Sequence, residues 1–169
     1  MPKVKSNSAP VRKGRGETIA SRKYSALKRT QSSSTGVIDL MGSRFFARPT
    51  QEKIGIIRAG ISKNQLVKLK EQFGLDYVVL SQILSVAKTT LHNKKGTQKF
   101  DSPTSEKILS LADLYSYGYD VFEEKESFNR WMNKPSMALG DKKPIDYVDT
   151  LYGIEEIKKE IGRIEWGVY

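Results

Sequence analysis

Residues 74–96 read GLDYVVLSQILSVAKTTLHNKKG, and they contain the clearest structural motif of the chain. Asp76 is placed to cap a short helix in which the apolar positions 79, 80, 83 and 84 share one face. After a turn at Ser85, a second short helix is expected from Ala87 to Lys95, in which only Leu91 needs burial. Two short helices joined by such a turn, the second exposed and basic, form a helix-turn-helix, a motif that binds DNA.

The second helix of this motif would carry the side chains that read DNA. Asn bonds adenine, Lys reaches guanine and a Thr methyl contacts the thymine methyl, whereas two adjacent lysines suit phosphates better. The expected DNA-binding residues are Lys88, Thr89, Thr90, His92, Asn93, Lys94 and Lys95. The alternative is a basic helical hairpin that only fills a core.

Further helices are expected on both sides of the motif. Ser62 is placed to cap a helix over residues 63–73, which Gly74 would end. Pro103 opens a longer helix that Gly118 would end. The earlier apolar runs GVIDLMG (36–42) and KIGIIRAG (53–60) are expected as helix pieces or short strands.

The C-terminal third continues this pattern. A helix in residues 120–135 would bury its large apolar side chains, a short element begins near Pro144, and a last helix starts at Gly153. The buried residues expected in these helices are Phe122, Phe128, Trp131, Met132, Ile154, Ile157, Ile161 and Ile164. Because no ordered segment alternates convincingly at period two, the expected fold class is mostly α.

Charge divides the chain into a basic front and an acidic back. Residues 1–50 carry eleven basic and two acidic side chains, and residues 51–100 carry nine and three, whereas residues 101–169 carry nine and fourteen. A basic half commonly faces nucleic acid, and an acidic half does not suit the same partner. We therefore expect two separate interaction surfaces.

The first 36 residues have few large apolar side chains and a run of Ser and Thr, so we expect a disordered basic arm. It either tracks phosphates or serves as a solubilising tail. A mitochondrial transit peptide is the weaker interpretation, because no amphipathic apolar face accompanies the charges.

The residue inventory disfavours catalysis. The chain has no cysteine and one histidine, it shows no metal-ligand spacing or phosphate-binding loop, and its acidic half alternates carboxylates with lysines. Asp146 and Asp149 are the remaining candidates for an acid and base pair. We expect no enzyme, cofactor, metal or small-molecule substrate. No stretch is apolar enough for a membrane span, and a cytoplasmic protein is expected.

Two later stretches and the helix-turn-helix together match the pattern of a known family. The helix-turn-helix is followed by FNRWMNKPSMALGDKKPIDYVDT (128–150) and YGIEEIKKEIGRIEWGVY (152–169), in this order and spacing. From about residue 37 onward the chain resembles the Xre/MbcA/ParS family of bacterial antitoxins. The resemblance implies an Xre-like DNA-binding domain at 37–118 and a small helical toxin-binding domain at 119–169, behind the arm at 1–36.

The resemblance also implies a function. The partner would be a RES-domain toxin that uses NAD, and the antitoxin would block its active site and repress the shared operon. Homodimers, larger complexes with toxin and association with the nucleoid through operator DNA would follow. The toxin-binding residues would be Arg163, Glu165, Trp166, Gly167, Val168 and Tyr169, and the carboxylate of Tyr169 would mimic an anionic group of the toxin's substrate.

Two alternatives stay open at this stage. The chain could be a free-standing dimeric helix-turn-helix repressor with no toxin partner. The aromatic end could also pack back on Phe128 and Trp131 instead of facing a partner.

Overall fold

The computed structural model describes Leu40 and residues 44–168 of the chain. Every regular element within these residues is a helix, and β pairing is limited to two isolated bridges, Ser62–Lys99 and Ser136–Lys142. The predicted mostly α fold is therefore confirmed. The predicted arm at 1–36, and GVIDLMG apart from its Leu40, lie outside the described residues.

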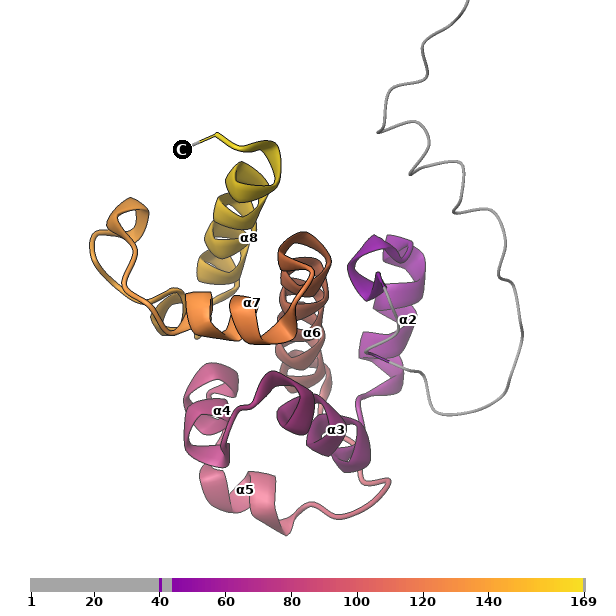
Figure 1. Ribbon diagram of the computed structural model, residues 1–169. Helices are drawn as coiled ribbons and strands as arrows, with labels where there is room; N and C mark the ends of the chain where they lie inside the picture. The colour runs from indigo at the N-terminus through magenta and orange to yellow at the C-terminus, as the bar shows by residue number, and fades with distance from the viewer. Residues whose placement is uncertain (1–39, 41–43, 169) are drawn as a thin grey trace, which may run out of the picture. The chain divides into compact units, whose positions relative to one another are not determined.

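Figure 1 shows α6 (Ser102–Phe122) running through the middle of the described part, with the other helices packed around it. The run at 53–60 lies in a helix and not in a strand. The remaining elements are η2 (Phe45–Ala47), α2 (Thr50–Ala59), α3 (Lys63–Phe73), α4 (Tyr77–Leu84), α5 (Lys88–Asn93), α7 (Lys125–Met132), η3 (Met137–Leu139), η4 (Pro144–Tyr147) and α8 (Leu151–Trp166).

Local capping signals set several helix ends. Ser62 forms a reciprocal capping box with Gln65 at the start of α3. Asp76 accepts from the Val79 N–H at 2.8 Å and starts α4, and the Thr150 hydroxyl accepts from the Gly153 N–H at 3.0 Å and starts α8. These side chains satisfy backbone donors that a helix start leaves without partners. The predicted caps of α3 and α4 are confirmed.

The prediction that Gly118 ends the long helix is wrong. Helix α6 continues to Phe122, and a Cβ added at Gly118 would lie 2.2 Å from the Phe128 ring. The glycine therefore lets α7 approach α6 closely. The predicted domain boundary at 118/119 falls inside this continuous helix, and the described residues all belong to one compact unit.

The predicted buried residues of α7 centre on Phe128, which has no exposed surface. Its ring meets Tyr115 at 5.2 Å and Tyr119 at 5.5 Å edge to face, and it stacks with Trp131 at 5.8 Å. Such aromatic pairs add to the free energy of unfolding beyond the contribution of the apolar area that they bury. Met132 is fully buried as predicted, whereas Phe122 and Trp131 are only half-buried because they lie at the outer rim of this cluster.

A partly buried charge network joins three helices. Asp113 of α6 accepts from Lys53 of α2 at 2.7 Å and from Lys158 of α8 at 3.3 Å. Lys53 also donates to the Phe46 carbonyl at 2.8 Å. The Asp113 side chain is 16% exposed, so water screens these contacts little.

We expect the Asp113→Ala substitution to lower the free energy of unfolding by about 1–3 kcal/mol, because two sheltered ammonium groups lose their shared carboxylate. Chemical denaturation measures this loss. The matched control is Asp120→Ala, which removes the more exposed Arg44–Asp120 pair at 3.3 Å and should cost about 0–1 kcal/mol. Equal losses for the two variants would contradict the network's role.

Candidate functional site

Helices α4 and α5 form the helix-turn-helix that the sequence predicts. Leu91 of α5 is fully buried, and Leu80 and Leu84 of α4 are buried with it. Ser85, at the turn, has a left-handed backbone with φ of 53°. Helix α5 is shorter than predicted, because the chain becomes extended at Lys94.

The loop after α5 turns back onto the start of α3. Gln98 O accepts from the Lys63 N–H and Gly96 O accepts from the Asn64 N–H, both at 2.9 Å. Lys94 is half-buried: its ammonium donates to Lys99 O at 2.6 Å and lies 5.2 Å from the centre of the Phe100 ring. Of the predicted DNA-binding lysines, Lys94 is therefore the one whose ammonium is held by its own loop.

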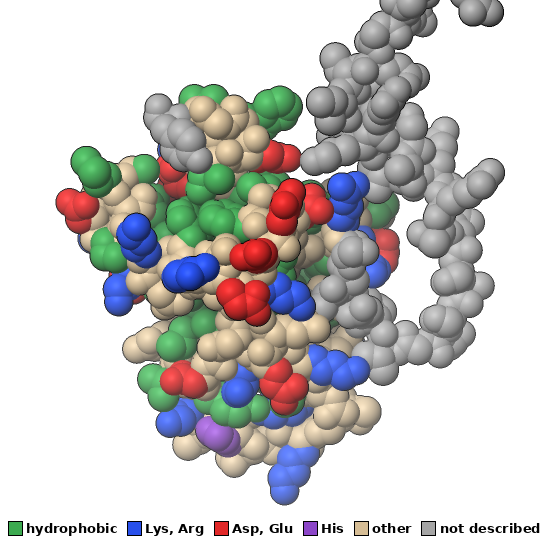
Figure 2. All heavy atoms as spheres, viewed as in Figure 1, with side chains coloured by type: hydrophobic (Ala, Val, Ile, Leu, Met, Phe, Trp, Pro, Cys, Tyr) green, Lys and Arg blue, Asp and Glu red, His purple; other side chains and the backbone are tan. Residues whose placement is uncertain are grey.

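The other predicted DNA-binding side chains are exposed and lie together on α5 and just after it. The ring of His92 packs against Tyr77 of α4, with ring centres 4.5 Å apart, which restricts how freely the imidazole can reach a base. Figure 2 shows lysine and arginine side chains and the histidine over the α5 end of the molecule. The exposed set is Lys88, Thr89, Thr90, His92, Asn93 and Lys95.

The predicted toxin-binding residues lie at the far end of α8. Three isoleucines of the predicted stripe, at positions 154, 157 and 161, are buried and hold the helix against the core, whereas Ile164 is half-buried. Beyond them, Trp166 is 76% exposed and Val168 is 62% exposed. The alternative in which this end packs back on Phe128 and Trp131 is therefore wrong for Trp166. Tyr169 lies outside the described residues.

The polar members of this end have partners within the chain. Arg163 pairs with Glu160, and Glu165 accepts a hydrogen bond at 2.6 Å from the Tyr117 hydroxyl of α6. Burial and the neighbouring Glu165 carboxylate raise the pKa of Tyr117 above its usual range, so the hydroxyl keeps its proton for this bond. Gly167 takes a left-handed conformation (φ of 65°) at the helix end, and the Val168 N–H donates to Arg163 O at 2.9 Å.

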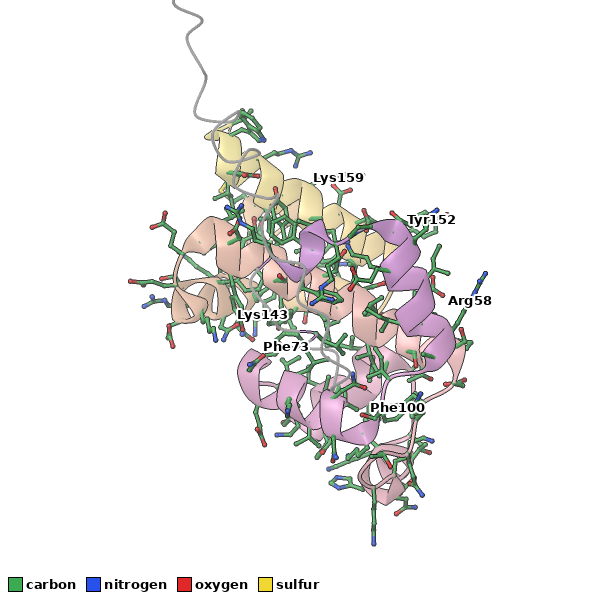
Figure 3. The ribbon with its side chains drawn as sticks, turned by 90° about the vertical axis from the view of Figure 1, so that its right-hand side faces the viewer. Arg58, Phe73, Phe100, Lys143, Tyr152 and Lys159 are labelled. Atoms are coloured by element: carbon green, nitrogen blue, oxygen red, sulfur yellow. The ribbon has the colours of Figure 1, made fainter. Side chains whose placement is uncertain are left out.

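Sequence reasoning missed the two most exposed apolar side chains of the C-terminal part. Tyr152 is 93% exposed at the start of α8, where Figure 3 shows it directed away from the helices, and Met137 is 89% exposed in η3. Tyr152 lies two residues before the buried Ile154, so helical periodicity could have placed it on the outer face. For Met137 the sequence offers no such signal.

A cavity of about 640 Å³ lies where the α3–α4 turn and α4 face α7 and η4. Asp76, Asp146 and Asp149 line it together with Asn129. Asp76 already serves as the cap of α4, and Asp146 and Asp149 are both exposed. An exposed carboxylate lacks the shielding that tunes an acid and base pair, so this arrangement does not favour catalysis.

Two further properties concern only the part of the chain that the structure describes. No group of three or more His, Asp or Glu side chains there is arranged to hold a metal ion. None of its helices combines the length and the apolar character needed to cross a membrane.

Two protein-family models match the chain, and each match contains one of the two candidate surfaces. Residues 52–113, which include α4 and α5, match the antitoxin Xre-like helix-turn-helix domain. Residues 118–167, which include α7 and α8, match the antitoxin Xre/MbcA/ParS C-terminal toxin-binding domain.

Two curated relatives agree with these matches. A "Prs ADP-ribosylating antitoxin" of Sphingobium sp. (strain YBL2) is 27% identical over 128 residues, which are 70% of this chain and 80% of the relative. An "Antitoxin Xre" of Photorhabdus laumondii subsp. laumondii is 31% identical over 74 residues, which are 43% of this chain and half of the relative. With an Xre-like helix-turn-helix followed by a toxin-binding domain, the chain belongs to the Xre/MbcA/ParS family of antitoxins.

Proposed function

We propose that this chain is the antitoxin of a type II toxin–antitoxin system and blocks the active site of a cognate NAD-using RES-domain toxin. The observation that supports this most is the exposed apolar end of α8, where Trp166 lies in a domain matched as toxin-binding and Val168 directly follows that match. Large aromatic side chains are the usual anchors of protein interfaces. The name of the Sphingobium relative mentions ADP-ribosylation, a reaction whose ADP-ribose comes from NAD, and this supports a toxin that uses NAD.

The end of α8 is preorganised for contact with a partner, because packing and hydrogen bonds already hold it in place. Buried isoleucines fix the helix axis, and the Tyr117–Glu165 hydrogen bond holds its last turn against α6. A partner would therefore order few side chains on binding, which favours affinity. In this mechanism Trp166, Val168 and Tyr169 enter the toxin's cleft. Arg163, Glu165 and the turn at Gly167 then form the polar rim of the interface on the antitoxin side. The antitoxin acts by occupying the site and performs no reaction itself.

We also propose that the chain represses its own operon by binding operator DNA with α5. A helix-turn-helix dimer places its two recognition helices about 34–36 Å apart, one turn of DNA. We propose that two copies of this chain bind operator DNA in this way. Toxin molecules join this dimer by binding the end of α8 in each copy. Lys88 and Lys95 then contact phosphates or guanine, and Asn93 reads adenine.

Co-expression with the product of the adjacent open reading frame tests the proposal. The full chain should restore growth and co-purify with that product, and a chain without residues 166–169 should do neither. The toxin expressed alone should lower cellular NAD if it is of the RES class. If the neighbour is neither toxic nor co-purified, the chain is a free-standing dimeric repressor, and its exposed apolar end most simply joins two copies.

Asn93→Ala should relax discrimination at one base pair of the operator and cost about 1–3 kcal/mol on specific DNA alone. Binding to operator variants and to random DNA, titrated at several salt concentrations, measures this effect. Lys95→Ala is the control, because Lys95 is exposed and should weaken all DNA binding and reduce the salt slope by about 1. Equal loss on specific and random DNA for Asn93→Ala would contradict the orientation assigned to α5.

A further inference from the structure

Lys63, the first residue of α3, is a buried lysine with 7% exposure. Its ammonium donates to the Tyr77 hydroxyl at 2.9 Å and to the Leu91 carbonyl, and lies 4.3 Å from the centre of the Tyr77 ring. In the described part of the chain its partners are thus a hydroxyl, a carbonyl and an aromatic face. An ammonium loses its hydration on burial, so a buried lysine is stable only where fixed hydrogen-bond acceptors replace the lost water.

The carbonyl that Lys63 binds belongs to α5, which has little support of its own. Helix α5 has only six residues, and its N-cap, Ala87, has no capping side chain. A helix this short is not stable alone in water. The last carbonyls of an α-helix have no N–H of a following turn to accept from, and a positive donor at this end is favourable. Lys63 supplies that donor from another helix.

Lys63 also connects α5 to its neighbours. Tyr77 is the first residue of α4, and its ring lies against His92 of α5. The backbone N–H of Lys63 donates to Gln98 O at 2.9 Å, in the loop that follows α5. One residue therefore holds both helices of the helix-turn-helix and the loop after them.

We infer that Lys63 is the positioning residue of the DNA-reading helix, setting sequence discrimination from inside the protein without contacting DNA. The inference rests on the proposed DNA-binding function. Its physical basis is that base contacts need the helix to be held within a fraction of an ångström, whereas attraction to phosphates does not. Loss of the clamp should therefore affect specific binding far more than non-specific binding.

The test compares Lys63→Met with Lys70→Met in the full chain. Lys70 lies on the same helix and its ammonium is 5.3 Å from the centre of the same Tyr77 ring, so the control removes the same charge near the same ring. We expect Lys63→Met to lower affinity for DNA upstream of the chain's own gene by about tenfold. Its effect on random DNA should not exceed that of Lys70→Met.

A second measurement does not depend on DNA. In Lys63→Met the backbone amides of α5 should exchange with solvent about tenfold faster than in Lys70→Met, while those of α8 stay unchanged. Co-purification with the toxin should also be unchanged. Tyr77→Phe, which removes the hydroxyl but keeps the ring, should shift exchange and specificity in the same direction by a smaller factor, and it replaces Lys63→Met if that variant does not fold.

The outcomes distinguish a failure of the role inferred for Lys63 from a failure of the proposed operator binding. Unchanged α5 exchange, or equal loss on specific and random DNA, would overturn the role of Lys63. If the unmodified chain binds no DNA upstream of its gene, the operator proposal fails, and amide exchange still decides whether Lys63 holds α5.

Discussion

Replacing Trp166 by alanine is expected to weaken toxin binding by at least about 2 kcal/mol, which is about 30-fold in Kd. The indole is 76% exposed in the free chain, so alanine removes a large apolar contact with a partner and almost nothing from the core. The free energy of unfolding should therefore change by no more than about 0.5 kcal/mol. Calorimetric titration of the purified neighbouring gene product, together with denaturation of the free variant, measures both quantities.

The matched control is Tyr152→Ala at the opposite end of α8. Tyr152 is an aromatic residue with 93% exposure, and its loss should leave toxin binding within about 0.5 kcal/mol. If Tyr152→Ala weakens the complex and Trp166→Ala does not, the interface lies at the start of the helix. DNA affinity separates the two proposed functions, because Trp166→Ala leaves it unchanged in an antitoxin and lowers it if this end joins two repressor subunits.

Replacing Phe128 by alanine should lower the free energy of unfolding by about 3–5 kcal/mol. The ring has no exposed surface, packs among four other aromatic rings and lies directly on Gly118. Its removal leaves a cavity at the junction of α6 and α7, which the rigid neighbours can fill only in part. Denaturant titration followed by circular dichroism measures the loss.

Met137→Ala is the control for Phe128→Ala. Met137 is 89% exposed in η3, and its loss should change stability by no more than about 0.5 kcal/mol. Because α6 continues through both matched domains, we also expect one cooperative transition in which helix-turn-helix and C-terminal part unfold together. Two separate transitions, with the helix-turn-helix unaffected, would mean that the 118/119 boundary divides independent domains.

The class of fold, several helix ends and the family could all be predicted from the amino-acid sequence. Ser62 and Asp76 were recognisable as caps, and Leu91 as the one buried residue of the recognition helix. These features depend on residues three or four positions apart, so the local pattern contains the information needed. The order of the motifs at 74–96, 128–150 and 152–169 was enough to identify the Xre/MbcA/ParS family.

The residues that support the two candidate surfaces depend on how the helices pack, which the sequence pattern does not contain. Gly118 looked like a helix end, but the distant Phe128 ring gives it a different role. Lys63 meets Leu91 across 28 positions, and Tyr117 meets Glu165 across 48. Such pairs form because helices pack side by side, and helical periodicity says which face is buried but not which residue lies opposite. For the same reason, the exposure of Trp166 became known only once the neighbours of α8 were in place.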